Sequence, residues 1–66
     1  MTISLNGEPH DLDTPLSVSA LLATLEIDAR RVAVEINSEV VRRARYGETL
    51  VGAGDQVEIV NFVGGG

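Results

Sequence analysis

QVEIVNFV, residues 56–63, is the stretch of sequence that decides the fold. A glycine-containing turn precedes it, so it is predicted to be the last strand of the chain. Neighbouring side chains of a strand point to opposite faces, so Val57 and Ile59 share one face. Val60 and Phe62 then share the other. If the first pair joins the core, the second pair stands on an open face, which predicts a sheet covered on one side only.

Four further strands are predicted before this one. They cover residues 2–5, 8–13, 32–36 and 39–42. The strongest local signal is Asn6-Gly7, because both central positions of a type I′ hairpin turn need a positive φ. Pro9 has no N–H group, so it places the second strand at a sheet edge. Asn37-Ser38 is predicted to be a turn, and residues 43–50 an irregular stretch.

One helix is predicted between the second and third strands. Its apolar residues recur at i, i+3, i+4 and i+7 and form a single stripe: Val18, Leu21, Leu22 and Leu25. Thr14 or Ser17 is expected to cap this helix, with Pro15 near its first turn. Ile27 is expected to close the contact with the sheet, and residues 28–31 to form a loop. The chain is therefore predicted to be an α+β domain, a mixed sheet of four to five strands with one main helix on one face.

Length and composition are consistent with one small domain. The chain has 66 residues, of which 44% are hydrophobic, enough for a real core. Tyr46 and Phe62 are its only aromatic residues, so we expect valine, leucine and isoleucine to fill that core. The sequence contains no cysteine, which excludes disulfides, thiolate metal sites and a thiol nucleophile. Residues 1–63 are predicted to be the folded domain, and residues 64–66 a flexible tail.

The charge balance bears on partners and location. The net charge is −5 and all five cations are arginines, which argues against a nucleic-acid partner. The first residues show no signal peptide and no segment reaches membrane-spanning length, so we expect a cytoplasmic protein without a membrane partner. Arg42, Arg43 and Arg45 cluster around a predicted turn. They are either a solubilising surface or a docking site for an acidic patch on a partner.

Phe62 has two interpretations. On an open face beside Val60 it is an aromatic anchor for a partner protein. Alternatively, it folds over a sheet edge and fills a gap in the packing.

The glycine run Gly64-Gly65-Gly66 also has two interpretations. Extended, its three residues reach about 10 Å, and glycine is slim enough to enter a narrow tunnel. The α-carboxylate of Gly66 could then be captured by a partner or activated for acyl transfer. Otherwise the run is a frayed end or a plain linker.

Three stretches together resemble a known family. They are "ISLNGEP" (3–9), "VAVEINSEVVRR" (32–43) and "GDQVEIVNFVGGG" (54–66). The chain resembles the ThiS family, the sulfur carrier proteins of thiamine biosynthesis, which have a ubiquitin-like (β-grasp) fold. Family members end in two glycines after a variable residue, and Gly64 takes the variable place here.

The resemblance implies that the protein is a substrate and not an enzyme. An ATP-dependent adenylyltransferase of the ThiF/E1-like type would adenylate the carboxylate of Gly66, and persulfide sulfur would convert it to a thiocarboxylate. The sulfur would come from a donor such as a cysteine desulfurase or a rhodanese-like protein. It would pass to a thiazole synthase of the ThiG type. No cofactor would be bound by the carrier itself, since the partner uses the ATP.

The expected site is Gly66 as the reacting group, with no metal, since the acidic residues show no ligand spacing. The expected partner-binding residues are Gly64, Gly65, Phe62, Val60 and Glu58. Two alternatives stay open. One is a sulfur carrier for molybdopterin synthesis or tRNA thiolation. The other is a non-covalent β-grasp adaptor.

Overall fold

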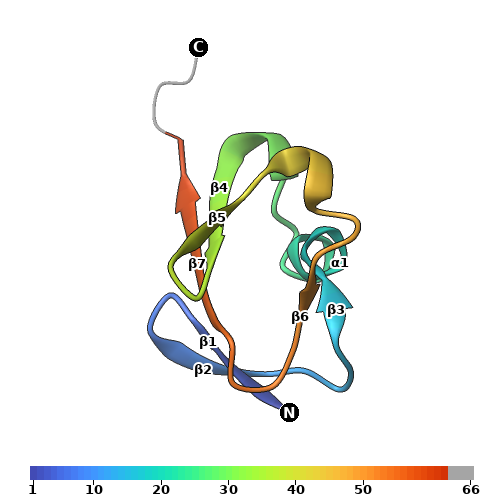
Figure 1. Ribbon diagram of the computed structural model, residues 1–66, viewed down its shortest axis with the longest axis vertical. Coiled ribbons are helices and arrows are strands. Elements are labelled where there is room, and N and C mark those ends of the chain that lie inside the picture. Colours follow the sequence, from blue (N-terminus) through green and yellow to red (C-terminus); the bar gives the residue numbers. More distant parts are fainter. Residues whose placement is uncertain (63–66) are drawn as a thin grey trace.

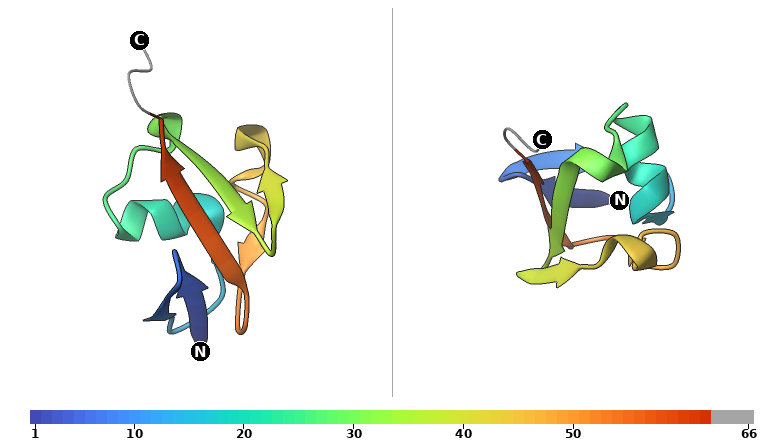
Figure 2. Two further views of the ribbon diagram at one scale, coloured as in Figure 1. Left: turned by 90° about the vertical axis from the view of Figure 1, so that its left-hand side faces the viewer. Right: turned by 90° about the horizontal axis from the view of Figure 1, so that it is seen from above.

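The main element of the protein is a five-stranded mixed sheet with the order β2-β1-β7-β4-β5. The computed structural model describes residues 1–62. The sheet strands are β1 (Thr2–Leu5), β2 (Glu8–Asp11), β4 (Val32–Ile36), β5 (Glu39–Val41) and β7 (Gln56–Asn61). β1 and β7 run parallel and the other neighbours antiparallel. Helix α1 lies on one side of the sheet (Figure 1, Figure 2), which confirms the predicted α+β class.

Two hairpins connect neighbouring strands through turns with positive φ. Asn6 and Gly7 have φ values of 50° and 84°, and Asn37 and Ser38 have 53° and 71°. Both turns are where the sequence predicts them. β2 is an edge strand, as its proline indicates. It ends at residue 11 and not at residue 13, because the chain then turns inward and buries Leu12, which is 6% exposed.

Helix α1 (Val18–Thr24) begins where one of the two predicted caps places it. The Ser17 hydroxyl accepts a hydrogen bond from the backbone N–H of Ala20 at 3.0 Å. This bond satisfies a donor that has no partner within the helix. Pro15 lies outside the helix, because the two-residue strand β3 (Leu16–Ser17) intervenes. The helix ends before Leu25, which is its C-cap.

Residues 43–50, predicted to be irregular, are more ordered than the sequence indicates. They contain the 3₁₀ helix η2 (Arg43–Arg45) and the start of strand β6 (Leu50–Val51). β6 pairs with β3 to form a separate two-stranded sheet beside the helix. Residues 28–31, predicted to be a loop, contain the 3₁₀ helix η1 (Ala29–Arg31). No helix within residues 1–62 is long and apolar enough to cross a membrane.

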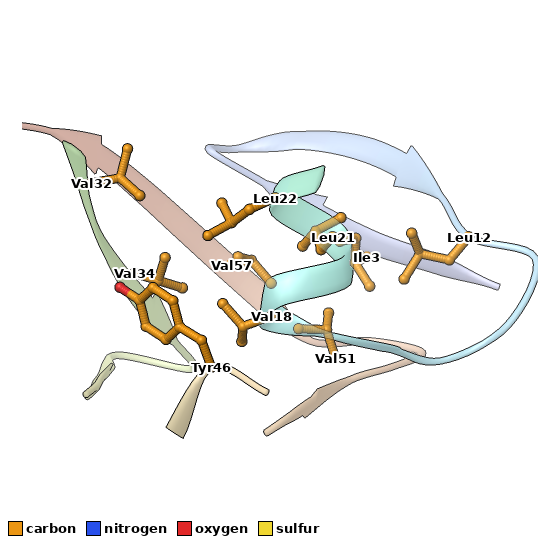
Figure 3. Packing of buried hydrophobic residues seen from close by; sticks show 10 residues of the cluster. All are labelled: Ile3, Leu12, Val18, Leu21, Leu22, Val32, Val34, Tyr46, Val51 and Val57. Carbon is orange, nitrogen blue, oxygen red and sulfur yellow. The ribbon is translucent and has the colours of Figure 1, made fainter. Parts of the chain in front are cut away.

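The core lies between α1 and the covered face of the sheet (Figure 3). Its buried residues are Ile3, Leu12, Val18, Leu21, Leu22, Val32, Val34, Tyr46, Val51 and Val57. Nine of the ten are aliphatic, as expected, and Tyr46 at the end of η2 is the exception. Ile27 packs against this cluster, as predicted.

The division of the sheet into a core face and an open face predicts two different responses to truncation. Leu22 is 1% exposed and Val60 is 57% exposed. We expect Leu22→Ala to lower the free energy of unfolding by about 2–5 kcal/mol, because it leaves a cavity. Val60→Ala should cost less than about 1 kcal/mol, the range of β-propensity. Urea denaturation of both variants measures the difference, and equal losses would contradict this division of the sheet.

Candidate functional site

The candidate site begins where β7 ends, at Asn61 and Phe62, which we call the tail root. Asn61 pairs with Val32 of β4. The backbone N–H of Phe62 donates a 2.9 Å hydrogen bond to the carbonyl of Arg31 in η1. The backbone is therefore held by its neighbours up to the last residue that the structure describes. β7 ends at Asn61, two residues before the predicted end at Val63. The site residues Gly64, Gly65 and Gly66 lie outside the described residues.

Alternate side chains of β7 divide as predicted. Val57 is 1% exposed and Ile59 is half-buried against the core, whereas Val60 and Phe62 are 57% and 53% exposed. With so much of its side chain exposed, Phe62 does not fill a gap in the packing. The open-face interpretation of these two side chains is therefore confirmed, and their contact with a partner stays a prediction.

The open face combines apolar and acidic side chains. Val40 is 70% exposed and pairs with Glu35, which in turn pairs with Glu58. Paired residues share a face, so Val40 lies on the same face as Val60. We call Val40, Val60 and Phe62 the open-face patch. The two neighbouring carboxylates make this face amphipathic and negatively charged.

Asn6 has a role that the sequence did not indicate. Its side-chain Oδ1 accepts a 2.7 Å hydrogen bond from the N–H of Ile59, and its Nδ2 donates to the carbonyl of Ile59 at 3.2 Å. Its own backbone N–H donates to the carbonyl of Val57 at 2.8 Å. β1 ends at Leu5, so the side-chain amide continues the pairing with β7 by one step. We call this pair of bonds the amide clamp. It ends three residues before Phe62.

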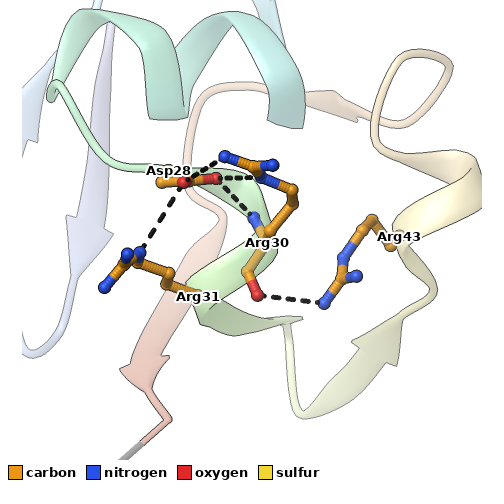
Figure 4. Close-up of polar contacts among 4 residues, drawn as sticks. All are labelled: Asp28, Arg30, Arg31 and Arg43. Atoms are coloured by element: carbon orange, nitrogen blue, oxygen red, sulfur yellow. Dashed lines mark hydrogen bonds and ion pairs between the residues drawn. The ribbon is translucent and has the colours of Figure 1, made fainter. Parts of the chain in front are cut away.

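The two 3₁₀ helices meet near the tail root (Figure 4). The Asp28 carboxylate accepts hydrogen bonds from the backbone N–H of Arg30 at 2.9 Å and from its guanidinium at 3.1 and 3.0 Å. The guanidinium bonds, followed by the backbone bond, lower the pKa of Asp28 from 3.8 to about 2. The Arg43 guanidinium donates to the carbonyl of Arg30 at 3.4 Å, which joins η2 to η1.

Sequence reasoning recognised only part of this group. Arg42, Arg43 and Arg45 were identified as a cluster, and the structure places them in and beside η2. For Arg30 and Arg31 the sequence predicts only a loop, whereas the structure places them in η1. No local pattern relates these two residues to the cluster in η2. The hydrogen bond from Arg43 to Arg30 joins segments that are distant in the sequence. Within residues 1–62, no group of three or more metal-ligating side chains is present.

The sheet order, the single helix on one face and the parallel pairing of the first and last strands define a ubiquitin-like β-grasp domain. The sequence model of the ThiS family matches residues 3–66, and the chain belongs to this family. A crystal structure of the thiamine biosynthesis protein ThiS from Geobacter metallireducens is similar, with a TM-score of 0.88 and 40% identity. The alignment covers 100% of both chains.

The curated relatives that match the chain include a sulfur carrier protein and proteins named thiazole synthase. The sulfur carrier protein ThiS of Bacillus subtilis is 40% identical over 50 residues, which cover 76% of each protein. A protein from Paramagnetospirillum magneticum named thiazole synthase is 44% identical over 66 residues. The chain spans only 20% of the length of that relative, and the same share of a second thiazole synthase, from Magnetococcus marinus.

The amide clamp predicts how β7 responds to changes at Asn6. In Asn6→Gly the positive φ is retained without strain, but both side-chain bonds to Ile59 are lost. We expect the free energy of unfolding to fall by about 1–3 kcal/mol, the usual net contribution of two hydrogen bonds. Amide hydrogen exchange at Ile59 should become faster, because this N–H loses its acceptor.

Asn37→Gly is the matched control, because Asn37 also has a positive φ and accepts from the N–H of Gln56 at 2.9 Å. That variant should accelerate exchange at Gln56 and leave Ile59 unchanged. Asn6→Asp retains the acceptor alone, so its effect at Ile59 should be smaller than that of Asn6→Gly. Unchanged exchange at Ile59 in Asn6→Gly would show that the amide clamp does not hold β7.

Proposed function

We propose that the protein is a sulfur carrier for the thiazole moiety of thiamine, and that its reacting group is the α-carboxylate of Gly66. The observation that carries the proposal is the match to the ThiS family over residues 3–66, a range that includes the whole glycine run. The likeness to the Geobacter protein named for thiamine biosynthesis favours this pathway over molybdopterin synthesis and tRNA thiolation. The name of the Bacillus relative gives the carrier role.

The chemistry follows from what a carboxylate needs for acyl transfer. An oxygen of the Gly66 carboxylate attacks the α-phosphorus of ATP, pyrophosphate leaves, and an acyl-adenylate forms. The terminal sulfur of a persulfide then attacks the acyl carbon and AMP leaves. Cleavage of the resulting S–S bond by a thiol leaves a thiocarboxylate on Gly66 and a disulfide on the donor side. Apart from this carboxylate the carrier needs no nucleophile or base. In this scheme ATP is a substrate of the partner and not a cofactor of this chain.

Three partners follow from these steps. An adenylyltransferase of the ThiF/E1-like type activates the carboxylate, and a cysteine desulfurase or rhodanese-like protein provides the persulfide. A thiazole synthase of the ThiG type accepts the sulfur. This last partnership is supported by proteins named thiazole synthase in which a segment similar to this chain occupies 20% of the length.

The open-face patch is proposed as the surface that these partners contact. Phe62 and Val60 are large apolar side chains more than half exposed, and they lie two and four residues before the glycine run. Glu58 is exposed on the same strand, on the side of the patch away from the tail root. A partner bound here holds the root of the tail, while Gly64 and Gly65 present no side chains that would obstruct a narrow tunnel.

Intact mass spectrometry tests the carrier function. The chain is incubated with its ThiF-type adenylyltransferase, ATP and a persulfide donor, and the mass should increase by the difference between a sulfur and an oxygen atom. A chain lacking all three glycines, residues 64–66, should keep its unfolding midpoint and show no increase. A wild-type chain whose mass never changes under these conditions would count against the carrier function and favour the adaptor.

Phe62→Ala tests the partner surface. Because Phe62 is 53% exposed, we expect the free energy of unfolding to change by less than about 1 kcal/mol. The KM for the carrier in the adenylation reaction should rise about 30-fold, as for loss of an aromatic anchor worth about 2 kcal/mol. Leu50→Ala is the control, since Leu50 is 64% exposed on β6 in the other sheet. A large loss of stability with an unchanged KM would disprove the anchor role.

A further inference from the structure

The charges of this protein are strongly segregated. All five cationic side chains lie in two short segments, residues 30–31 and 42–45. Two acids form ion pairs with them: Asp28 with Arg30 and Arg31, and Glu48 with Arg45. Of the ten acidic residues, the other eight are distributed over the remainder of the chain, which contains no lysine or arginine. The net charge of −5 therefore conceals a positive region on a negative body.

The two arginine segments lie together at the tail root. The Arg43 guanidinium reaches the carbonyl of Arg30, and the carbonyl of the next residue, Arg31, accepts from Phe62. The pairing of Val41 with Val34 directs the chain after β5 toward the same end of the sheet. Figure 1 and Figure 2 show both short helices at the end toward which β7 runs. We call Arg30, Arg31, Arg42, Arg43 and Arg45 the arginine pole.

The positive charge of the pole is only partly neutralised. The side chains of Arg30, Arg31 and Arg45 are 80%, 82% and 68% exposed even where they contact Asp28 or Glu48. The Arg31–Asp28 distance of 3.7 Å is the longest of these ion pairs. Among the described residues, Arg42 and Arg43 have no ion pair within 4.0 Å. Five guanidinium groups thus face two carboxylates, and the excess is positive.

We propose that the arginine pole binds a rim of carboxylates on the adenylyltransferase, around the opening that admits the glycine tail. The inference rests on the carrier function proposed above. An acidic rim is attracted by the pole and repelled by the acidic remainder of the surface. The carrier therefore approaches the rim with its tail end leading. A basic rim would be drawn to the body instead and would approach in the wrong orientation.

Protein carboxylates fit the pole better than the phosphates of ATP. Four residues, Val63 to Gly66, follow the tail root and end in the reacting carboxylate, a contour length of up to about 14 Å. Groups beside the tail root therefore face the entrance of the partner's tunnel and not the reacting atoms. Guanidinium groups bind carboxylates and phosphates alike in a bidentate manner, so the distance from the reacting atoms decides between the two. The pole should consequently change the KM for the carrier and leave kcat and the KM for ATP unchanged.

The test is the double variant Arg31→Gln/Arg42→Gln, assayed for adenylation and for direct binding to the enzyme by calorimetry. Both side chains are exposed, so the fold should be retained. At about 0.01 M salt, where the Debye length is about 30 Å, the KM for the carrier and the dissociation constant should rise about tenfold. At about 0.15 M salt, where the length is about 8 Å, the rise should be less than about threefold.

The matched control is Gln56→Glu/Thr14→Glu, which makes the same change in net charge at exposed positions away from the tail root. The KM for the carrier and the dissociation constant of this control should remain within about twofold of wild type. This is expected if the position of the charges matters and not the net charge alone, as steering by a local patch requires. Arg31→Lys/Arg42→Lys should recover most of the affinity. Equal losses in control and test variants, a changed KM for ATP, or a double variant that behaves like wild type would each overturn the proposal. A wild-type chain that binds the enzyme but never gains sulfur would count against the carrier function alone.

Discussion

Strand β7 pairs with β1 on one side and with β4 on the other, and the rest of the structure depends on this double pairing. The strand is central to the sheet, so the alternation of its side chains is imposed on the whole domain. The side chains of Val57 and Ile59 face the core beneath α1, and the same alternation places Val60 on the exposed face. A slip of one residue would exchange these faces and leave the helix without an apolar partner.

The same strand delivers the candidate site. β7 is held near its start by the Asn37 side chain, near its middle by the amide clamp of Asn6, and at its end by the Arg31 carbonyl. Each contact is a hydrogen bond to backbone, so the path of the strand does not depend on which side chains it exposes. The open face is thereby free to carry partner-binding residues. The tail root is thus fixed in position by the fold, whereas the length needed to reach a partner's reaction centre is left to the glycine run.

Elements with a periodic or local sequence pattern could be predicted, whereas contacts between segments distant in the sequence could not. The parity of β7, the Asn6-Gly7 turn and the apolar stripe of α1 are local patterns with periods that a sequence displays. β3 and β6 have two residues each, too few for a period, so their pairing was missed. The amide clamp joins residues 53 positions apart. The burial of Tyr46 likewise depends on where η2 places it.

The site shows the same division. The apolar side chains Val60 and Phe62 were predictable from alternation, and Arg42, Arg43 and Arg45 from their proximity in sequence. The sequence does not show that these arginines lie beside the tail root, because they contact it through η1. This 3₁₀ helix forms because Asp28 caps it. An expected loop became a turn of 3₁₀ helix through one carboxylate. The pole therefore arises from tertiary structure, although every residue in it is visible in the sequence.

Charge and apolar surface have different tasks in this arrangement. In the proposed complex, the open-face patch would provide area that is removed from water on contact, whereas the arginine pole would act at a distance and set the orientation. Glu35 and Glu58, paired across β4 and β7, add a third constraint. In a two-fold dimer whose axis passes beside this pair, the carboxylates of both copies would be brought together, and such like charges repel. The charges that border the patch would therefore oppose a dimer of this geometry, whereas they leave the proposed contact with a different protein open.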